Sequence, residues 1–343
     1  MKIRKRIDKE LTNFLHTLDK EYSVKKISPI LFGYIKEFVL RQGKRIRPAL
    51  FVIAYLGFAK KETSGLYTSA LSLELLHDFM LVHDDIIDKS DTRRGKPSMH
   101  RMFNSYLSRY KNLKFNGRDL AIVAGDVMYA IAIHAFLAIK ENMARKERAL
   151  KKFIRAAIYT GSGEFIELLC GTKDISRTSK EDIYNIYDFK TANYTFATPL
   201  ASGAILAGAS DSEVERLFQY GIYLGRAFQI KDDILGMFSE EQKIGKSNLT
   251  DLKEAKKTLL IWRAYNRSDK KNKKIIEIIL GKKNADRKDL LRMRKIVTAT
   301  GSLDYCRKEI HRSMNQAQEL IASSRIGLPY KSALHACAKE FLL

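Results

Sequence analysis

The chain has 343 residues, of which 45% are hydrophobic and 29% charged, so it holds enough apolar side chains for a large core. Its 62 Lys and Arg residues against 39 Asp and Glu give a net charge of +23. The basic stretches lack interleaved aromatics, zinc-finger spacing and RNA-binding motifs, which argues against a specific nucleic-acid binder. We interpret most of the charge as solvated surface, and the other partners that it suits are anionic membrane surfaces and phosphorylated small molecules.

Cysteine, proline and hydropathy patterns narrow the class further. Three cysteines, Cys170, Cys306 and Cys337, stand far apart without metal-ligand spacing, which favours a reducing cytoplasm over a disulfide framework or a zinc site. Only five prolines interrupt long stretches of helical periodicity, and no linker-like stretch or alternating strand pattern is visible. We therefore predict an all-α fold, a single helical bundle around a central cavity that forms one domain over residues 1–343.

The first helices lead to a basic turn. Helical periodicity predicts helices over residues 5–18 and 29–40, followed by RQGKRIRPALF, where Gly43 breaks the helix and Pro48 suits the first turn of the next. Lys44, Arg45 and Arg47 then lie near a helix N-terminus. Such a position suits an anion, although a basic turn is often only solvated.

The first acid-bearing helix is predicted over residues 66–88. Spacings of seven and four place His77, Asp84 and Asp88 on one stripe of this otherwise apolar helix. Acids in such a setting need a nearby cation, which Arg93 and Arg94 at the helix exit could supply. Their oxygens also suit magnesium holding a phosphate, whereas the simpler interpretation is a solvated helix end.

Further acids and a lysine follow. In the helix over residues 120–141, Asp126 is expected to be a satisfied core acid, and the most membrane-like window, Ala121–Ala138, is interpreted as a core helix. Glu164 and Glu167 share one face of a helix over residues 155–169 and need a cation nearby, unless they lie at the edge of the bundle. The next helix starts after a Ser179 cap and carries the KTANY segment.

A second acid cluster ends another apolar helix. In GRAFQIKDDILGMF, Asp232 and Asp233 come one turn after Gln229. Two acid clusters on separate helices suggest two walls that face one metal cluster. Lys246 follows in a loop and Lys256 on a helix that begins near Thr250. The segments up to Ile296, 302–323 and 329–343 are predicted as closing helices without chemistry of their own.

The ordered motifs GKRIRP, ELLHDFMLVHDDIIDKSDTRRGKP, VAGD, KTANYTF, FQIKDDILG and DLKEAKKTL span roughly residues 30–260. In this order they resemble the trans-isoprenyl diphosphate synthases, all-helical prenyltransferases that act as homodimers. The resemblance implies that allylic diphosphate ionises, isopentenyl diphosphate attacks the cation, and a proton then leaves to the departing diphosphate. No side-chain base is required, which fits the absence of a Ser/His/Asp or Cys/His signature.

The resemblance also assigns roles to residues. It implies that three magnesium ions bind between Asp84 and Asp88 on one wall and Asp232 on the other. The residues implied for the allylic diphosphate are Arg93, Lys190, Lys246 and Lys256, and those for isopentenyl diphosphate are Lys44, Arg47, His77 and Arg94. The residues implied around the cation are Lys190, Thr191, Tyr194, Phe228 and Gln229.

Product length is expected from Phe79, which stands five residues before Asp84 and so about 7.5 Å deeper along the helix. An aromatic residue there, with no large ring at Met80, resembles the archaeal geranylgeranyl diphosphate synthases and implies a C20 product, with C15 next. The chain departs from the family where Gly236 replaces a third aspartate, and where Glu164 and Glu167 replace glutamine and aspartate.

Other functions remain as alternatives. A non-catalytic partner subunit would share the fold, but such subunits commonly lose acids or bases that this chain keeps. A longer-chain polyprenyl synthase would share all the motifs. A terpene cyclase would use the acids but would have no need of a second diphosphate site at Lys44, Arg47 and Arg94, and a nucleic-acid binder would not explain the paired acid motifs.

Overall fold

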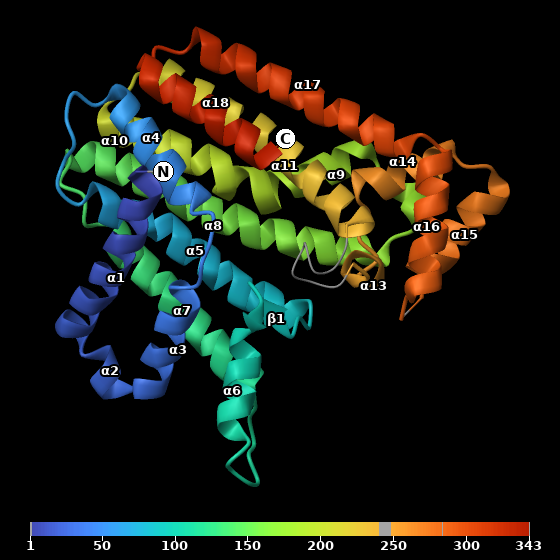
Figure 1. Ribbon diagram of the computed structural model, residues 1–343, viewed down its shortest axis with the longest axis horizontal. Helices are drawn as coiled ribbons and strands as arrows, with labels where there is room; N and C mark the ends of the chain where they lie inside the picture. Colours follow the sequence, from blue (N-terminus) through green and yellow to red (C-terminus); the bar gives the residue numbers. More distant parts are fainter. Residues whose placement is uncertain (1, 240–247, 283, 343) are drawn as a thin grey trace.

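The computed structural model describes residues 2–239, 248–282 and 284–342. It is almost entirely helical, which confirms the all-α prediction (Figure 1). The first helices are α1 (Lys2–Tyr22), α2 (Val24–Ile27), α3 (Pro29–Val39), α4 (Ile46–Phe58), α5 (Leu66–Ile87), α6 (Met99–Leu107), α7 (Gly117–Phe136) and α8 (Met143–Thr172). They are followed by a short 3-10 helix η1 (Ile175–Arg177), α9 (Lys180–Ile186), the π-helix η2 (Tyr187–Ala197), α10 (Thr198–Ala207), α11 (Asp211–Phe238), α13 (Thr250–Lys253), α14 (Leu259–Arg267), α15 (Lys270–Leu280), α16 (Arg287–Ala299), α17 (Ser302–Ser323) and α18 (Leu328–Leu342).

Helix α5 is buried along most of its length and organises one half of the molecule. It packs most extensively against α7 and also against α4, while α4 packs against α10. In the other half, α11 packs against η2 and α17, and α8 packs against η2 and α10. Figure 1 shows α17 and α18 on one side of the molecule and α6 projecting from the other. The two acid motifs therefore belong to different halves of one bundle.

Helix starts follow the local signals in the sequence. The hydroxyl of Ser28 accepts a hydrogen bond from the Leu31 amide, with Pro29 in the first turn of α3. The predicted Ser179 cap of α9 is confirmed, because Ser179 Oγ accepts from the Asp182 amide at 3.0 Å. Pro48 lies in the first turn of α4, as predicted.

Helices η2 and α11 approach each other backbone to backbone. A Cβ atom at Gly225 would come within 2.3 Å of Ala192 Cα, and one at Gly221 would come within 2.4 Å of Ala197 Cα. Only glycine allows this approach without a shift of the neighbouring backbone. The contact brings the KTANY segment of η2 against the FQIKDD segment of α11.

Three local features differ from the sequence prediction. Lys256 does not lie on a helix, because the helix that begins at Thr250 ends at Lys253 and the next begins at Leu259. The segment after Ser179 is not one α-helix, because its residues Tyr187–Ala197 form the wider turns of η2. A strand pair was not expected, but β1 (Thr92–Arg93) and β2 (Lys96–Pro97) pair antiparallel. Arg94 and Gly95 form the tight turn between them with φ of 55° and 72°, which suits the glycine.

Helix α7 is long and apolar enough to cross a membrane by length and composition. In this fold one of its faces packs along α5 and α6 and the other is exposed. The prediction that Asp126 is a core acid is wrong, because its side chain is 68% exposed and lies near His83, with 3.7 Å between Oδ1 and the imidazole Nε2.

Candidate active site

One cavity of about 730 Å³ lies between α5 on one side and α8, η2 and α11 on the other, with the segment 43–47 at one end. Every predicted site residue that the structure describes lines it. These residues are Lys44, Arg47, His77, Phe79, Met80, Asp84, Asp88, Arg93, Arg94, Lys190, Thr191, Tyr194, Phe228, Gln229, Asp232 and Lys256. The remaining predicted residue, Lys246, lies outside the described residues.

The acids that were predicted to bind metal stand on two walls of this cavity. Asp84 and Asp88 lie at the C-terminal end of α5, and Asp232 lies on α11. Burial raises the pKa of Asp84 to about 6, because the charged form loses its hydration. Within the described part of the chain, no three His, Cys, Asp or Glu side chains converge on one point. An ion bound here would therefore need further oxygen ligands, which magnesium commonly takes from water and from a substrate phosphate.

Asp85, which the sequence analysis did not use, holds one of the predicted substrate ligands. It is fully buried on α5, and Arg93 Nε donates a hydrogen bond to its Oδ1 at 2.8 Å. Burial raises the pKa of Asp85 to about 6 even though Arg93 opposes the shift. The pair directs Arg93 along the cavity wall beside Asp84 and Asp88. The sequence signal that could have identified Asp85 was its position directly after Asp84.

Lys190 is the cation that Glu164 and Glu167 were expected to need. Both carboxylates of α8 make ion pairs with its ammonium group. Burial alone would lower the pKa of Lys190, but Glu167, Asp84 and Glu164 outweigh this effect and raise it. An anion that binds Lys190 must therefore compete with two carboxylates of the same chain.

A chain of hydrogen bonds fixes the amide of Gln229. Thr191 Oγ1 donates to Gln229 Oε1 at 2.6 Å, and Gln229 Nε2 donates to Asp233 Oδ1 at 2.9 Å. Asp233 is buried and also accepts a hydrogen bond from the hydroxyl of Tyr187. Burial raises the pKa of Asp233 well above its ordinary value. Asp233 thus orients Gln229, whereas its neighbour Asp232 is exposed.

Asp251 occupies the space next to Gly236, where the family resemblance leads one to expect a third aspartate. Its Oδ2 lies 2.8 Å from the place of a Cβ atom on Gly236, so a side chain at 236 would displace this carboxylate. Asp251 lines the cavity, and Lys256 lies 3.8 Å from Asp251 and 2.7 Å from Glu254. Sequence reasoning missed Asp251, although it stands in the quoted motif DLKEAKKTL.

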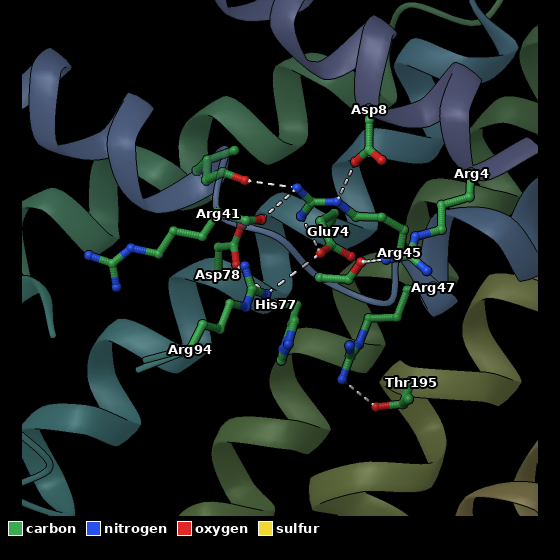
Figure 2. A network of polar contacts seen from close by, with 12 residues as sticks. Arg4, Asp8, Arg41, Arg45, Arg47, Glu74, His77, Asp78, Arg94 and Thr195 are labelled. Atoms are coloured by element: carbon green, nitrogen blue, oxygen red, sulfur yellow. Dashed lines mark hydrogen bonds and ion pairs between the residues drawn. The ribbon is translucent and has the colours of Figure 1, made fainter. Parts of the chain in front are cut away.

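The opposite end of the cavity contains a buried network of arginines and acids (Figure 2). Arg45 is 3% exposed and, unlike the exposed Lys44 beside it, points into the protein. Its Nη1 donates to Glu74 Oε1 at 2.7 Å, and its Nε donates to Asp8 Oδ1 at 2.9 Å. Arg94 Nη2 lies 3.0 Å from Asp78 Oδ1. The sequence analysis identified none of the acids in this network.

Two of the predicted anion ligands at this end have unused donors. Arg47 Nε and Arg94 Nη1 are buried without a hydrogen-bond partner among the described residues. Arg47 Nη2 donates to the hydroxyls of Tyr194 and Thr195 at 2.9 and 2.8 Å. Burial and Arg47 lower the pKa of His77, which keeps this imidazole neutral. Buried donors that lack partners suit an anion, because leaving them unpaired costs free energy.

Comparisons with known proteins identify relatives of this chain in sequence and in fold. The sequence profile of the Polyprenyl synthetase family matches residues 28–297. A short chain isoprenyl diphosphate synthase of Methanocaldococcus jannaschii is 32% identical over 82% of this chain and 77% of its own length. A geranylfarnesyl diphosphate synthase of Aeropyrum pernix is 32% identical over 91% of each chain. The crystal structure of a geranylgeranyl pyrophosphate synthase from Corynebacterium glutamicum, complexed with isoprenyl diphosphate and magnesium, has a TM-score of 0.90 at 27% identity and covers 99% of this chain and 98% of its own.

Proposed function

The chain belongs to the polyprenyl synthetase family of trans-prenyltransferases, and we propose that it condenses isopentenyl diphosphate with C5, C10 or C15 allylic diphosphates. The observation that carries this proposal is the placement of Asp84 and Asp88 opposite Asp232 in one cavity, with basic side chains at both ends. A terpene cyclase would not require the buried, unpaired donors of Arg47 and Arg94 at the second end.

The residues divide into two diphosphate sites. Lys190, Lys256 and Arg93 surround the acid walls and hold the allylic diphosphate, while Lys44, Arg47 and Arg94 hold isopentenyl diphosphate. Magnesium, for which we propose three ions, would neutralise the leaving diphosphate between the acid walls. We propose that the allylic cation forms beside the fixed amide of Gln229, the Thr191 hydroxyl and the Phe228 ring, which all line the cavity. Positive charge is stabilised there by oriented dipoles and by the aromatic face.

We propose a C20 product, with C15 as the next candidate. Phe79 and Met80 line the cavity on the same helix as Asp84, about one turn before it, and we expect the growing tail to meet them. The relatives include both short-chain and geranylfarnesyl enzymes, and a longer product remains the competing assignment.

The exposed apolar face of α7 and α8 supports the proposal of a homodimer. Ile154, Ile158, Phe165 and Leu169 follow one stripe of α8 at spacings of four, seven and four, and each is at least 37% exposed. Val123 on α7 is 56% exposed. In a chain with a net charge of +23, such a stripe suits a second copy of itself, because burying it removes apolar surface from water.

The free cysteines support the proposal of a cytoplasmic location. All three cysteines are free, as in a reducing compartment.

The basic surface supports the proposal of contact with an anionic lipid surface. The α15 and α16 helices expose Lys270, Lys271, Lys274, Arg287, Lys288, Arg292 and Lys295, and Lys282, after the end of α15, is exposed as well. The exposed Ile278 and Leu291 lie among them. Cosedimentation with phosphatidylglycerol vesicles but not phosphatidylcholine vesicles is expected, and it should be lost near ~1 M salt.

The direct test of the activity is incubation with magnesium, labelled isopentenyl diphosphate and each allylic starter, followed by chromatographic sizing of the products. Asp84→Asn and Asp232→Asn should each lower kcat/KM by about a hundredfold or more, since both remove a metal ligand. The exposed Asp304→Asn is the matched control. Absence of product from every starter would favour a non-catalytic partner subunit, and turnover without isopentenyl diphosphate would favour a cyclase.

A further inference from the structure

Phe79, the residue proposed above to meet the growing tail, is contacted by a helix that does not line the cavity. Phe79 of α5 lines the cavity, and its ring centroid lies 5.2 Å from that of Tyr129 on α7. The two planes are inclined by 34°. Tyr129 is half-buried and is not among the residues that line the cavity. It therefore contacts the far side of the Phe79 ring.

A second neighbour of Phe79 is also fixed by α7. The ring of His83 stands edge-on to Phe79 at 4.7 Å, and its Nδ1 lies 3.2 Å from the Phe79 carbonyl oxygen. His83 in turn lies 3.7 Å from Asp126, and a Cβ atom at Gly125 would come within 2.4 Å of its Cε1. Three residues of one α7 face thus surround the two rings.

Tyr129 stands beside the Phe79 ring on the side of α7. Helices α5 and α7 form the most extensive helix pair in the described part of the chain, and small residues such as Ala121 and Ala124 bring α7 close. Interiors packed at this density contain few voids, so a ring moves only if its neighbour moves or is removed. The position of Phe79 consequently depends on the ring of Tyr129.

We propose that Tyr129 is a positioning residue for product length, because it holds the Phe79 ring in the path of the growing hydrocarbon tail. This rests on the proposed synthase function and adds to it a determinant that does not touch the substrate. Loss of the Tyr129 ring would let Phe79 turn toward α7 and lengthen the cavity.

The test compares products of wild type, Tyr129→Ala and Tyr129→Phe with the same starters. For Tyr129→Ala we expect a larger share of the product that is one C5 unit longer than the wild-type product. The ratio of this longer product to the wild-type product should rise about fivefold to tenfold. The rate of the first condensation, measured with the C5 starter, should stay within about twofold, because the acid walls are untouched. Tyr129→Phe keeps the ring and should give the wild-type product length.

Tyr159→Ala is the matched control. Tyr159 of α8 packs on Phe189 with the same centroid distance of 5.2 Å, but neither residue lines the cavity, so product length should not change. If Tyr129→Ala does not fold, judged by its helical circular dichroism, Tyr129→Leu replaces it with the same expected direction.

The outcomes distinguish a failure of the role proposed for Tyr129 from a failure of the proposed synthase function. An unchanged product length in a folded Tyr129→Ala or Tyr129→Leu variant overturns the role of Tyr129 while leaving the synthase function intact. A longer product from Tyr129→Phe, which keeps the aromatic ring, would overturn the assignment of this role to the ring. A wild-type protein that makes no prenyl product overturns the proposed function, and this inference with it.

Discussion

At the scale of single residues, the cations of the site are mostly already paired within the chain. Lys190 contacts Glu164 and Glu167, and Lys256 contacts Glu254. Arg93 and Arg94 contact buried acids of α5 in the same way. A diphosphate bound at the proposed site would therefore replace or share existing ion pairs. Which acid pairs with which base depends on side-chain rotamers and on the wide turn of η2. The sequence therefore indicated the charged residues but not their ion-pair partners.

The acid pair on Lys190 leads to the first prediction at this scale. Glu164→Gln removes one negative charge beside the ammonium group, so the KM for the allylic diphosphate should fall about threefold to tenfold. The KM for isopentenyl diphosphate should not change, since that substrate is expected at the other end of the cavity. Steady-state kinetics with each substrate varied in turn measures both values.

Glu147→Gln provides the control for this variant. It makes the same chemical change on the same helix, where the Glu147 side chain is 65% exposed and paired with Lys151. A rise in the allylic KM of Glu164→Gln would instead mean that the carboxylate helps to hold the substrate.

Asp78 gives a prediction for pH dependence. Burial raises its pKa from 3.8 to about 7; Arg94 opposes this rise and Glu74 adds to it, while Arg45 and Arg47 also oppose it. The folded chain then binds more protons at this site than the unfolded chain between about pH 4 and about pH 7, so stability falls as pH rises through that range. Asp78→Asn removes this titration. Its free energy of unfolding relative to wild type should therefore increase from pH 5 to pH 8.

Urea denaturation at several pH values measures this difference. The exposed Asp304→Asn should show no such trend, because its carboxylate is solvated. A relative stability of Asp78→Asn that decreases with pH would show that Arg94 keeps the native carboxylate charged.

At the scale of elements, most of the fold could be predicted from the sequence. Periodic apolar residues and caps such as Ser179 located the helices, because these signals are local. The π-helix η2 escaped prediction because its wide turn depends on contacts with α11, including the Gly225 and Ala192 approach. The pair of strands joined by the turn at Arg94 and Gly95 was missed because each strand has only two residues.

The anchoring of the basic turn gives a prediction at this scale. Arg45 connects this turn both to α5 through Glu74 and to α1 through Asp8. Glu74 is 2% exposed and Asp8 is 50% exposed, so the two links differ in strength. Glu74→Gln should cost about 3–5 kcal/mol of unfolding free energy, since it leaves buried arginines uncompensated. Asp8→Asn should cost less than about 1 kcal/mol.

Chemical denaturation of the two variants beside wild type tests this ranking. Each variant replaces a carboxylate by its own amide, so side-chain size is matched. Equal losses would mean that α1 and α5 anchor the turn equally.

At the scale of the whole molecule, the unusual combination is a strong positive charge with one apolar stripe on α8. Surface lysines and arginines repel like surfaces, whereas the stripe favours association. If the homodimer forms through it, Ile158→Glu should raise the dimer dissociation constant by at least about tenfold, because a charge would be buried at the interface. Light scattering after gel filtration distinguishes the 39.3 kDa monomer from the dimer.

Ile27→Glu is the control for the dimer experiment. Ile27 is 77% exposed on the short helix α2, away from the stripe, and should leave the mass unchanged. A wild-type protein that remains monomeric at high micromolar concentration would contradict the homodimer.

The backbone contact between η2 and α11 has a mechanical consequence. With no side chain between them at Gly221 and Gly225, the two helices cannot slide or separate without breaking direct contacts of their main chains. We therefore expect η2 and α11 to move together, so any widening of the cavity for a long product would involve its other walls, including α5. Gln229, proposed to face the allylic cation, thus belongs to the η2–α11 unit, whereas Phe79, proposed to limit product length, belongs to α5.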